Sequence, residues 1–206
     1  MLGGSQLATY EAISEVSTSL KKLIWNNIKG TALGEQVGEN GIAFNHPTDN
    51  DAGSNAKKLS IFLFKIGENS YHQNHPLSYA DGSGHPIALD LYYMITAHFE
   101  KSLSDHMLMN QKLIGRVVQI FHENQVLRVP ALEDTLSDED IKIFSYDMPL
   151  EEIGKIWGSI LESNPYMLSV FYEVTPVIID SKTMVAAKRA TKVSFDNQKG
   201  GVKSNV

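Results

Sequence analysis

The histidines near the middle of the sequence come closest, by type and spacing, to a chemical site. His72 and His75 are separated by Gln73 and Asn74, and His85 follows them. Two imidazoles three positions apart can bind zinc together when a third ligand approaches. The segment around them is polar and not helical in pattern, and no glutamate completes a zincin motif. A polar surface loop therefore explains these residues better than a metal site, and a small metal-dependent hydrolase built on His72, His75 and His85 is the alternative.

Other signatures of catalysis are missing from the sequence. The chain has no cysteine, which excludes disulfides, thiolate ligands and cysteine nucleophiles. It has neither a G-x-S-x-G elbow nor a phosphate-binding loop, and its early glycines do not follow a strand. The acidic run from Glu133 to Asp140 lacks the spacing of a calcium loop. Asp90 lies on the polar face of an otherwise apolar strand and is expected to pair with a basic side chain or to face solvent, with a perturbed catalytic carboxylate as the alternative. We predict a protein that is not an enzyme and holds no cofactor or metal.

Length and composition indicate one folded domain followed by a basic tail. The chain has 206 residues, of which 42% are hydrophobic and 20% charged, enough apolar content for one buried core. Its formal net charge is −6. Residues 182–206 hold six basic residues against one acidic residue, a net charge of +5, which leaves −11 on the rest. This asymmetry predicts a tail that docks on an acidic neighbour, including another copy of the chain.

The first and most apolar segments give no sign of export or of a membrane helix. Met1 to Tyr10 lacks the basic start, apolar run and cleavage site of a secretory signal. Ile87 to Phe99 is too short for a bilayer span and contains Asp90. The acidic body would repel phosphate, and only Phe195 adds an aromatic ring to the basic tail, which argues against nucleic-acid binding. We expect a soluble protein with no direct membrane insertion.

Helices are predicted where apolar residues recur every three or four positions. This pattern covers residues 7–28, about 104–123 and about 149–161. Ser104-Asp105 is a plausible cap for the second helix, and Pro149 suits the first position of the third. The four glycines between residues 30 and 41 predict a loop. On the second helix, the residues expected to share one face are Met107, Ile114, Val117, Val118 and Phe121.

Strands are predicted where apolar residues alternate or form a short continuous run. These segments are 42–44, 59–66, 87–99, 141–147 and 166–179. Pro176 indicates an edge or a bend near the end of the last strand. The order of elements predicts an α/β fold: a single domain with a mixed β-sheet and helices packed mainly on one face.

Several ordered segments resemble one family, the cap or tail-terminator proteins of extracellular contractile injection systems. These systems are phage-tail-like particles of the virulence-cassette and antifeeding-prophage type. The similarity spans about residues 7–181 and is strongest in ALDLYY (88–93) and LSVFYEV (168–174). Further similar segments are LSIFLFKIGENSYHQN (59–74), HPIALDLYYMITAHF (85–99), KLIGRVVQIFHENQVL (112–127), the helix with Trp157, and YMLSVFYEVTPVIIDS (166–181).

The resemblance implies a ring, usually sixfold, that sits at the distal end of the particle and terminates the inner tube and the sheath. The expected partners are further copies of the chain, giving a hexamer, together with the inner tube protein and the sheath protein. No catalytic residues belong to such a family, so none is transferred. We expect assembly in the cytoplasm of the producing bacterium, within a particle that can be released. A phage tail connector protein is the first alternative to a cap, and the metal-dependent hydrolase is the second.

Two segments are the expected contact elements: the polar connection from Gly67 to Gly84 and the basic tail. We expect a cap-like α/β domain over residues 1–181 and a flexible basic tail over residues 182–206. The tail can add a strand to a neighbouring chain. The residues predicted to bind partners are Tyr71, His72, Asn74, His75, Tyr79, Lys188, Arg189, Lys192 and Phe195.

Overall fold

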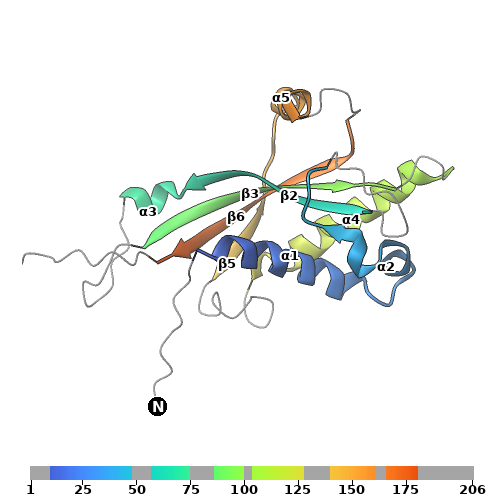
Figure 1. The fold of residues 1–206 in the computed structure, drawn as a ribbon, viewed down its shortest axis with the longest axis horizontal. Coiled ribbons are helices and arrows are strands. Elements are labelled where there is room, and N and C mark those ends of the chain that lie inside the picture. The colour runs from blue at the N-terminus through green and yellow to red at the C-terminus, as the bar shows by residue number, and fades with distance from the viewer. Residues whose placement is uncertain are drawn as a thin grey trace, which may run out of the picture.

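Six strands form one mixed sheet in the computed structural model (Figure 1), which describes residues 10–47, 57–74, 86–99, 104–127, 140–160 and 166–180. The strands are β1 (Ile42–Ala43), β2 (Leu59–Glu68), β3 (Ile87–Ala97), β4 (Val126–Leu127), β5 (Ile141–Ser145) and β6 (Ser169–Ile179). The helices are α1 (Ala12–Ile28), α2 (Ala32–Val37), α3 (Ser70–Asn74), α4 (His106–Glu123) and α5 (Leu150–Ile160), with a 3-10 turn at Glu39–Gly41.

The sheet is built around the two longest strands, β3 and β6. Its strand order is β1-β2-β3-β6-β5-β4. β1 pairs parallel to β2, and the other four pairs are antiparallel, so the sheet is mixed as predicted. β3 pairs with β2 from Leu89 to Ala97 and with β6 from Ile87 to Thr96. The central strand is therefore held on both edges along almost its whole length.

The larger core lies between the sheet and the helices on one of its faces, which include α1 and α4 (Figure 1). The α1 residues Val16, Leu20 and Ile24 are fully buried because they recur every four positions and share one side of the helix. Tyr93 of β3 is also fully buried, and its hydroxyl lies 2.9 Å from the Ser17 hydroxyl of α1. This hydrogen bond joins the first helix to the central strand.

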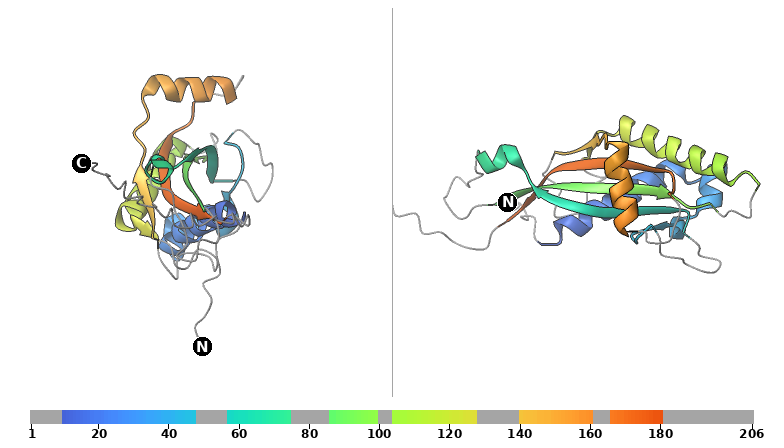
Figure 2. Two further views of the ribbon diagram at one scale, coloured as in Figure 1. Left: turned by 90° about the vertical axis from the view of Figure 1, so that its left-hand side faces the viewer. Right: turned by 90° about the horizontal axis from the view of Figure 1, so that it is seen from above.

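A smaller core lies on the opposite face, under α5. Figure 2 shows α5 crossing above the strands, on the side of the sheet away from α1 and α4. Met94 and Phe171, a cross-strand pair, are buried there against Trp157 of α5. The prediction of helices mainly on one face is confirmed, with α5 as the helix on the other face.

Some details differ from the prediction. Residues 32–37 form helix α2, although the glycines around them predicted a loop, and residues 70–74 form helix α3 in a segment predicted as a polar connection. Ile114, Val117 and Phe121 lie on the buried side of α4 as predicted, together with Leu113 and Ile120, but Met107 and Val118 are 59% and 42% exposed. Asp105 precedes α4, but its side chain makes no capping hydrogen bond.

Pro176 fits its predicted position in β6. β5 pairs with β6 only as far as Thr175, so in the described part of the chain Pro176 has β3 alone as a neighbouring strand. The pairing of β3 with β6 also shifts there, because one residue of β3, Asp90, faces two residues of β6. Proline is tolerated at such a bulge because the position requires no N–H for a ladder hydrogen bond.

Candidate functional site

Asn69 ties the predicted contact segment to the sheet. It follows β2, and its backbone N–H donates to the Ala88 carbonyl of β3 at 2.8 Å. Its side-chain oxygen accepts from the backbone N–H of His72 at 3.1 Å, and its amide nitrogen donates to Asp90 at 2.8 Å. α3 therefore starts from a residue that is fixed to the centre of the sheet.

Asp90 is buried and hydrogen-bonded, which corrects the prediction that it pairs with a basic side chain or faces solvent. It is 8% exposed, and its carboxylate accepts from the side chains of Asn69 and Thr175. Asn69 also donates to the Thr175 hydroxyl at 3.1 Å. A buried carboxylate is stable only when its lone pairs are used, and here two neutral donors on β6 and at the end of β2 supply the hydrogen bonds.

A second polar group lies beside Asp90 on the same face. The Tyr92 hydroxyl donates to Glu173 at 3.3 Å, and the Lys65 ammonium lies 4.5 Å from the centre of the Tyr92 ring. Burial raises the pKa of the Glu173 carboxyl, and the charge of Asp90 raises it further. Burial also raises the pKa of Tyr92 to about 12, with the charge of Glu173 as the next cause. Alternation in the sequence predicts that Asp90 and Tyr92 share a face of one strand, and that Glu173 and Thr175 share a face of another. It does not predict that these two strands are neighbours.

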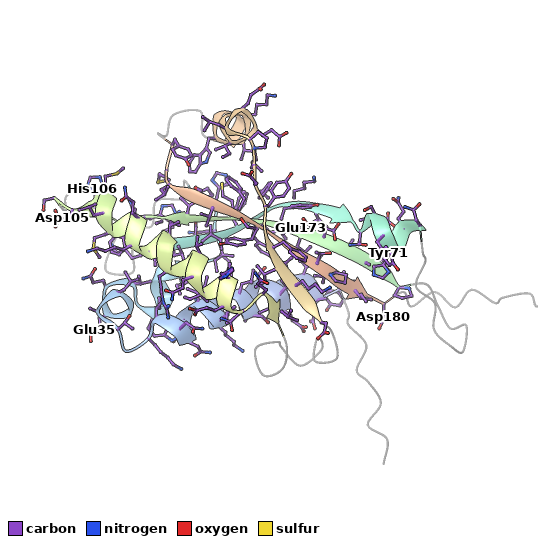
Figure 3. All side chains as sticks on the ribbon, turned by 180° about the vertical axis from the view of Figure 1, so that it is seen from behind. Glu35, Tyr71, Asp105, His106, Glu173 and Asp180 are labelled. Atoms are coloured by element: carbon purple, nitrogen blue, oxygen red, sulfur yellow. The ribbon has the colours of Figure 1, made fainter. Side chains whose placement is uncertain are left out.

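The structure places three of the predicted contact residues on α3. Tyr71 is 66% exposed, with its ring edge-on to the His72 ring at 5.2 Å. Asn74 is exposed and donates to the Ser70 carbonyl at 2.9 Å. These residues lie at one end of the long axis of the molecule, and Figure 3 shows Tyr71 and His106 at opposite ends.

The remaining predicted residues lie outside the part of the chain that the structure describes. They are His75, Tyr79, His85, Lys188, Arg189, Lys192 and Phe195. Within the described ranges, no group of three or more His, Asp or Glu side chains is arranged to hold a metal ion. The three-histidine site of the hydrolase alternative has only His72 in those ranges.

His98 is a partly buried histidine whose charge state is coupled to folding. Its Nε2 lies 2.9 Å from the Ser60 hydroxyl of β2. Burial lowers the pKa of His98 to about 4, and the charge of Lys57 lowers it further. The unfolded chain binds the proton near pH 6.5, whereas the folded chain binds it only near pH 4. The free energy of unfolding therefore decreases as the pH falls from about 6.5 to about 4. Above this window His98 is neutral in both the folded and the unfolded chain, and it causes no loss of stability.

We expect this loss to disappear in the variant His98→Gln, which cannot titrate. Between pH 7 and pH 4 the wild type should lose on the order of 2 kcal/mol more unfolding free energy than the variant. Urea unfolding of both proteins across that range measures the difference. His122→Gln, the same change at an exposed histidine of α4, is the control. A wild-type-minus-variant difference that stays constant with pH would contradict this assignment.

None of the helices in the described ranges is both long and apolar enough to span a lipid bilayer.

Comparison with known structures shows the fold of the chain in an injection-system protein. One similar structure is described as the sheath/tube terminator of an extracellular contractile injection system, PVC, in its extended state. It has a TM-score of 0.56 and 16% sequence identity, with 93% of this chain and 65% of that chain covered. A second is described as the tube-terminating cap of the anti-feeding prophage, with a TM-score of 0.49 and 15% identity, covering 87% of this chain and 60% of that chain. The chain thus spans less than two thirds of either protein.

Sequence comparison gives the family. No curated protein matches the chain. The family model described as the Pvc16 N-terminal domain matches residues 15–192, which include every described helix and strand after the first turn of α1. This match confirms the predicted resemblance to caps of contractile injection systems. The chain belongs to the family of the Pvc16 N-terminal domain.

Proposed function

We propose that this chain is a structural cap, or terminator, protein that forms a ring and ends the inner tube and sheath of a contractile, phage-tail-like particle. The family match over residues 15–192 is the observation that supports this most strongly. The fold shared with the PVC sheath/tube terminator agrees with it. The proposed partners are further copies of the chain, usually six, together with a tube protein and a sheath protein. Assembly would take place in the bacterial cytoplasm.

The shape of the domain suits a head-to-tail ring. Such a ring needs two different patches on each copy, one for each neighbour. Exposed apolar side chains occur near α3, where Ile66, Tyr71 and Ile87 are 49%, 66% and 42% exposed. Two more, Met107 and Leu108, are 59% and 55% exposed at the start of α4. Because these groups lie at opposite ends of the molecule (Figure 3), one can face the other on the next copy.

The sheet gives this ring a rigid platform. β3 is paired on both edges, and Asn69 fixes α3 to it through the Ala88 carbonyl and the Asp90 carboxylate. A contact residue on α3 therefore keeps one position relative to the rest of the chain. A ring with such fixed surfaces can bind the last layer of a tube and offer no further acceptor surface, which stops polymerisation.

Tyr71→Ala is expected to weaken ring formation at least tenfold and leave the melting temperature unchanged. Truncating an exposed aromatic residue in an interface costs about 2 kcal/mol or more of binding, whereas an exposed side chain adds little to folding. Native mass spectrometry over a dilution series measures the ring, whose mass should be a multiple of 22.9 kDa. Tyr10→Ala is the matched control, because Tyr10 is 78% exposed and precedes α1.

The function itself is tested by adding the full chain to polymerising tube subunits of its own particle. A terminator should shorten the tubes and be found at one end of them by electron microscopy. Tyr71→Ala should need a higher concentration for the same effect, and Tyr10→Ala should not. A chain that stays monomeric at all concentrations and leaves tube length unchanged would overturn the proposal.

A further inference from the structure

A strip of the sheet between α3 and α5 has no described helix above it. Figure 2 shows α5 crossing this side of the sheet and α3 beyond the end of β2, with uncovered strands between them. We call this surface the bare strip and define it by the side chains that line it. They are Phe64 and Lys65 of β2, Tyr92 of β3, Phe144 of β5, Tyr146 just after β5, and Glu173 of β6.

The bare strip is aromatic and half-exposed. Phe144 is 49% exposed, and the Tyr92 ring lies 5.1 Å from the Tyr146 ring and 6.4 Å from the Phe64 ring. Neighbouring Phe64 and Tyr146 already pack on the smaller core under α5. The strip therefore continues a hydrophobic core outward to partly exposed aromatic rings, which further apolar side chains can cover.

The charges on and beside the strip favour a basic occupant. Two carboxylates, Glu173 and the buried Asp90, lie near one ammonium group, that of Lys65. The raised pKa of Glu173 follows from burial and from the charge of Asp90, so an additional cation would stabilise both carboxylates. An occupant with both basic and apolar side chains would complement the strip.

The chain itself contains such a segment directly after β6. Residues 182–206 have a net charge of +5 and include Met184, Val185, Val193 and Phe195. The family match continues past β6 to residue 192, so the first part of this segment lies within the matched domain. The segment begins two positions after Asp180, where the described part of β6 has just ended.

We propose that the basic segment Lys182–Val206 folds back onto the bare strip of its own chain, with its Lys188–Lys192 side chains beside Glu173 and its apolar side chains on the exposed aromatic rings. The contact would cover Phe144 and Tyr92 and place the net positive charge of the segment against the acidic body. It is independent of the proposed ring, because both partners are in one chain.

The length of the segment permits this contact. Glu173 lies seven positions before Asp180, about 23 Å back along β6 at a rise of about 3.3 Å per residue. Lys192 lies twelve positions after Asp180, so an extended chain reaches about 40 Å and has residues to spare for a turn. A tethered segment also has an effective concentration in the millimolar range, which favours its own chain over a neighbouring copy.

Disulfide trapping tests the proposal cleanly because the chain has no cysteine. Phe144→Cys is combined in the full chain with Lys188→Cys, Lys192→Cys or Phe195→Cys, and each protein is oxidised mildly at low concentration. At least one pair should form an intramolecular disulfide, seen as a faster-moving monomer on a non-reducing gel. A disulfide requires Cα atoms within about 7 Å, so trapping reports real proximity.

The control replaces Phe144→Cys by Glu35→Cys, a cysteine at an exposed position of α2. The Phe144 pairs should form at least tenfold faster than the control pairs, and raising the salt to about 1 M or adding Glu173→Gln should slow them. Equal rates for both sets would overturn the proposal. Disulfide-linked dimers instead of monomers would also overturn it, because they would place the segment on a second copy.

Discussion

Asp90→Ala is expected to lower the unfolding free energy by about 3 kcal/mol. The carboxylate accepts hydrogen bonds from Asn69 and Thr175, and Thr175 is 9% exposed. Without it, the buried Thr175 hydroxyl and the partly buried Asn69 amide lose their acceptor, and each buried group left unsatisfied costs about 1–3 kcal/mol. The residual hydrogen bond between Asn69 and Thr175, 3.1 Å long, offsets only part of this cost.

Chemical denaturation at pH 7 measures the change. The control is Glu68→Ala, at an exposed position of β2, whose unfolding free energy should stay within about 0.5 kcal/mol of wild type. Asp90→Asn keeps one acceptor oxygen and should lose less than half as much stability as Asp90→Ala. Hydrogen exchange of α3 should also rise in Asp90→Ala, because Asn69 loses one of its anchors to the sheet. Equal stability of Asp90→Ala and Glu68→Ala would refute the structural role assigned to this carboxylate.

The strands could be predicted from sequence because their side-chain pattern reflects burial directly. In β3, Leu91, Tyr93 and Ile95 alternate with Tyr92 and Met94, and the first three lie in the larger core whereas Met94 lies in the smaller one on the other face. The same holds for Val174 and Val177 of β6, although the bulge at Pro176 shifts the alternation by one position. Alternation predicts which face a residue lies on, but it does not predict which strands are neighbours. The pairing of β3 with both β2 and β6 therefore required the structure.

The polar cluster could not be predicted for the same reason. Asp90, Thr175 and Asn69 come from two strands and the end of a third, and their hydrogen bonds join positions 21, 85 and 106 residues apart. Without strand order, a lone aspartate in an apolar strand is ambiguous between a surface position and a buried one. Proximity of β2, β3 and β6 resolves the ambiguity in favour of burial.

For the predicted contact residues, exposure could be predicted from the sequence, but position in the folded molecule could not. Polar composition correctly placed Tyr71 and Asn74 on the surface, since both are exposed on α3. Their proposed role in binding depends on shape, because only the folded chain shows that α3 and the start of α4 lie at opposite ends (Figure 3). The family resemblance predicts the kind of assembly, and the exposed apolar ends are the surfaces that we propose for it.

α2 was missed because a glycine can signal close packing as well as a turn. Thr31 begins the helix, and its hydroxyl accepts from the Gly34 N–H at 3.1 Å and donates to the Ile28 carbonyl at 2.6 Å. These bonds hold the first turn of α2 against the end of α1. A Cβ on Gly34 would overlap the Ile28 carbonyl, with the Ile28 carbonyl carbon only 2.7 Å away. The residue is glycine because two backbones touch there.

Gly34→Ala is accordingly expected to destabilise the chain by about 3 kcal/mol, at the upper end of the usual cost of overpacking. The atoms in the way belong to the backbone, so α2 must move away from α1, and Val37, which is 5% exposed, loses part of its packing. Thermal and urea unfolding measure the effect, with Trp25 on α1 as a fluorescent reporter close to the site.

Gly115→Ala is the matched control, because the same methyl group is added inside α4, where nothing lies within 4 Å of the new Cβ. Alanine favours a helix over glycine by about 0.5–1 kcal/mol, so this variant should be more stable than wild type. The two substitutions should thus differ in sign, by roughly 4 kcal/mol in total. Two variants of equal stability would mean that α2 moves freely on α1 and that Gly34 is not a packing residue.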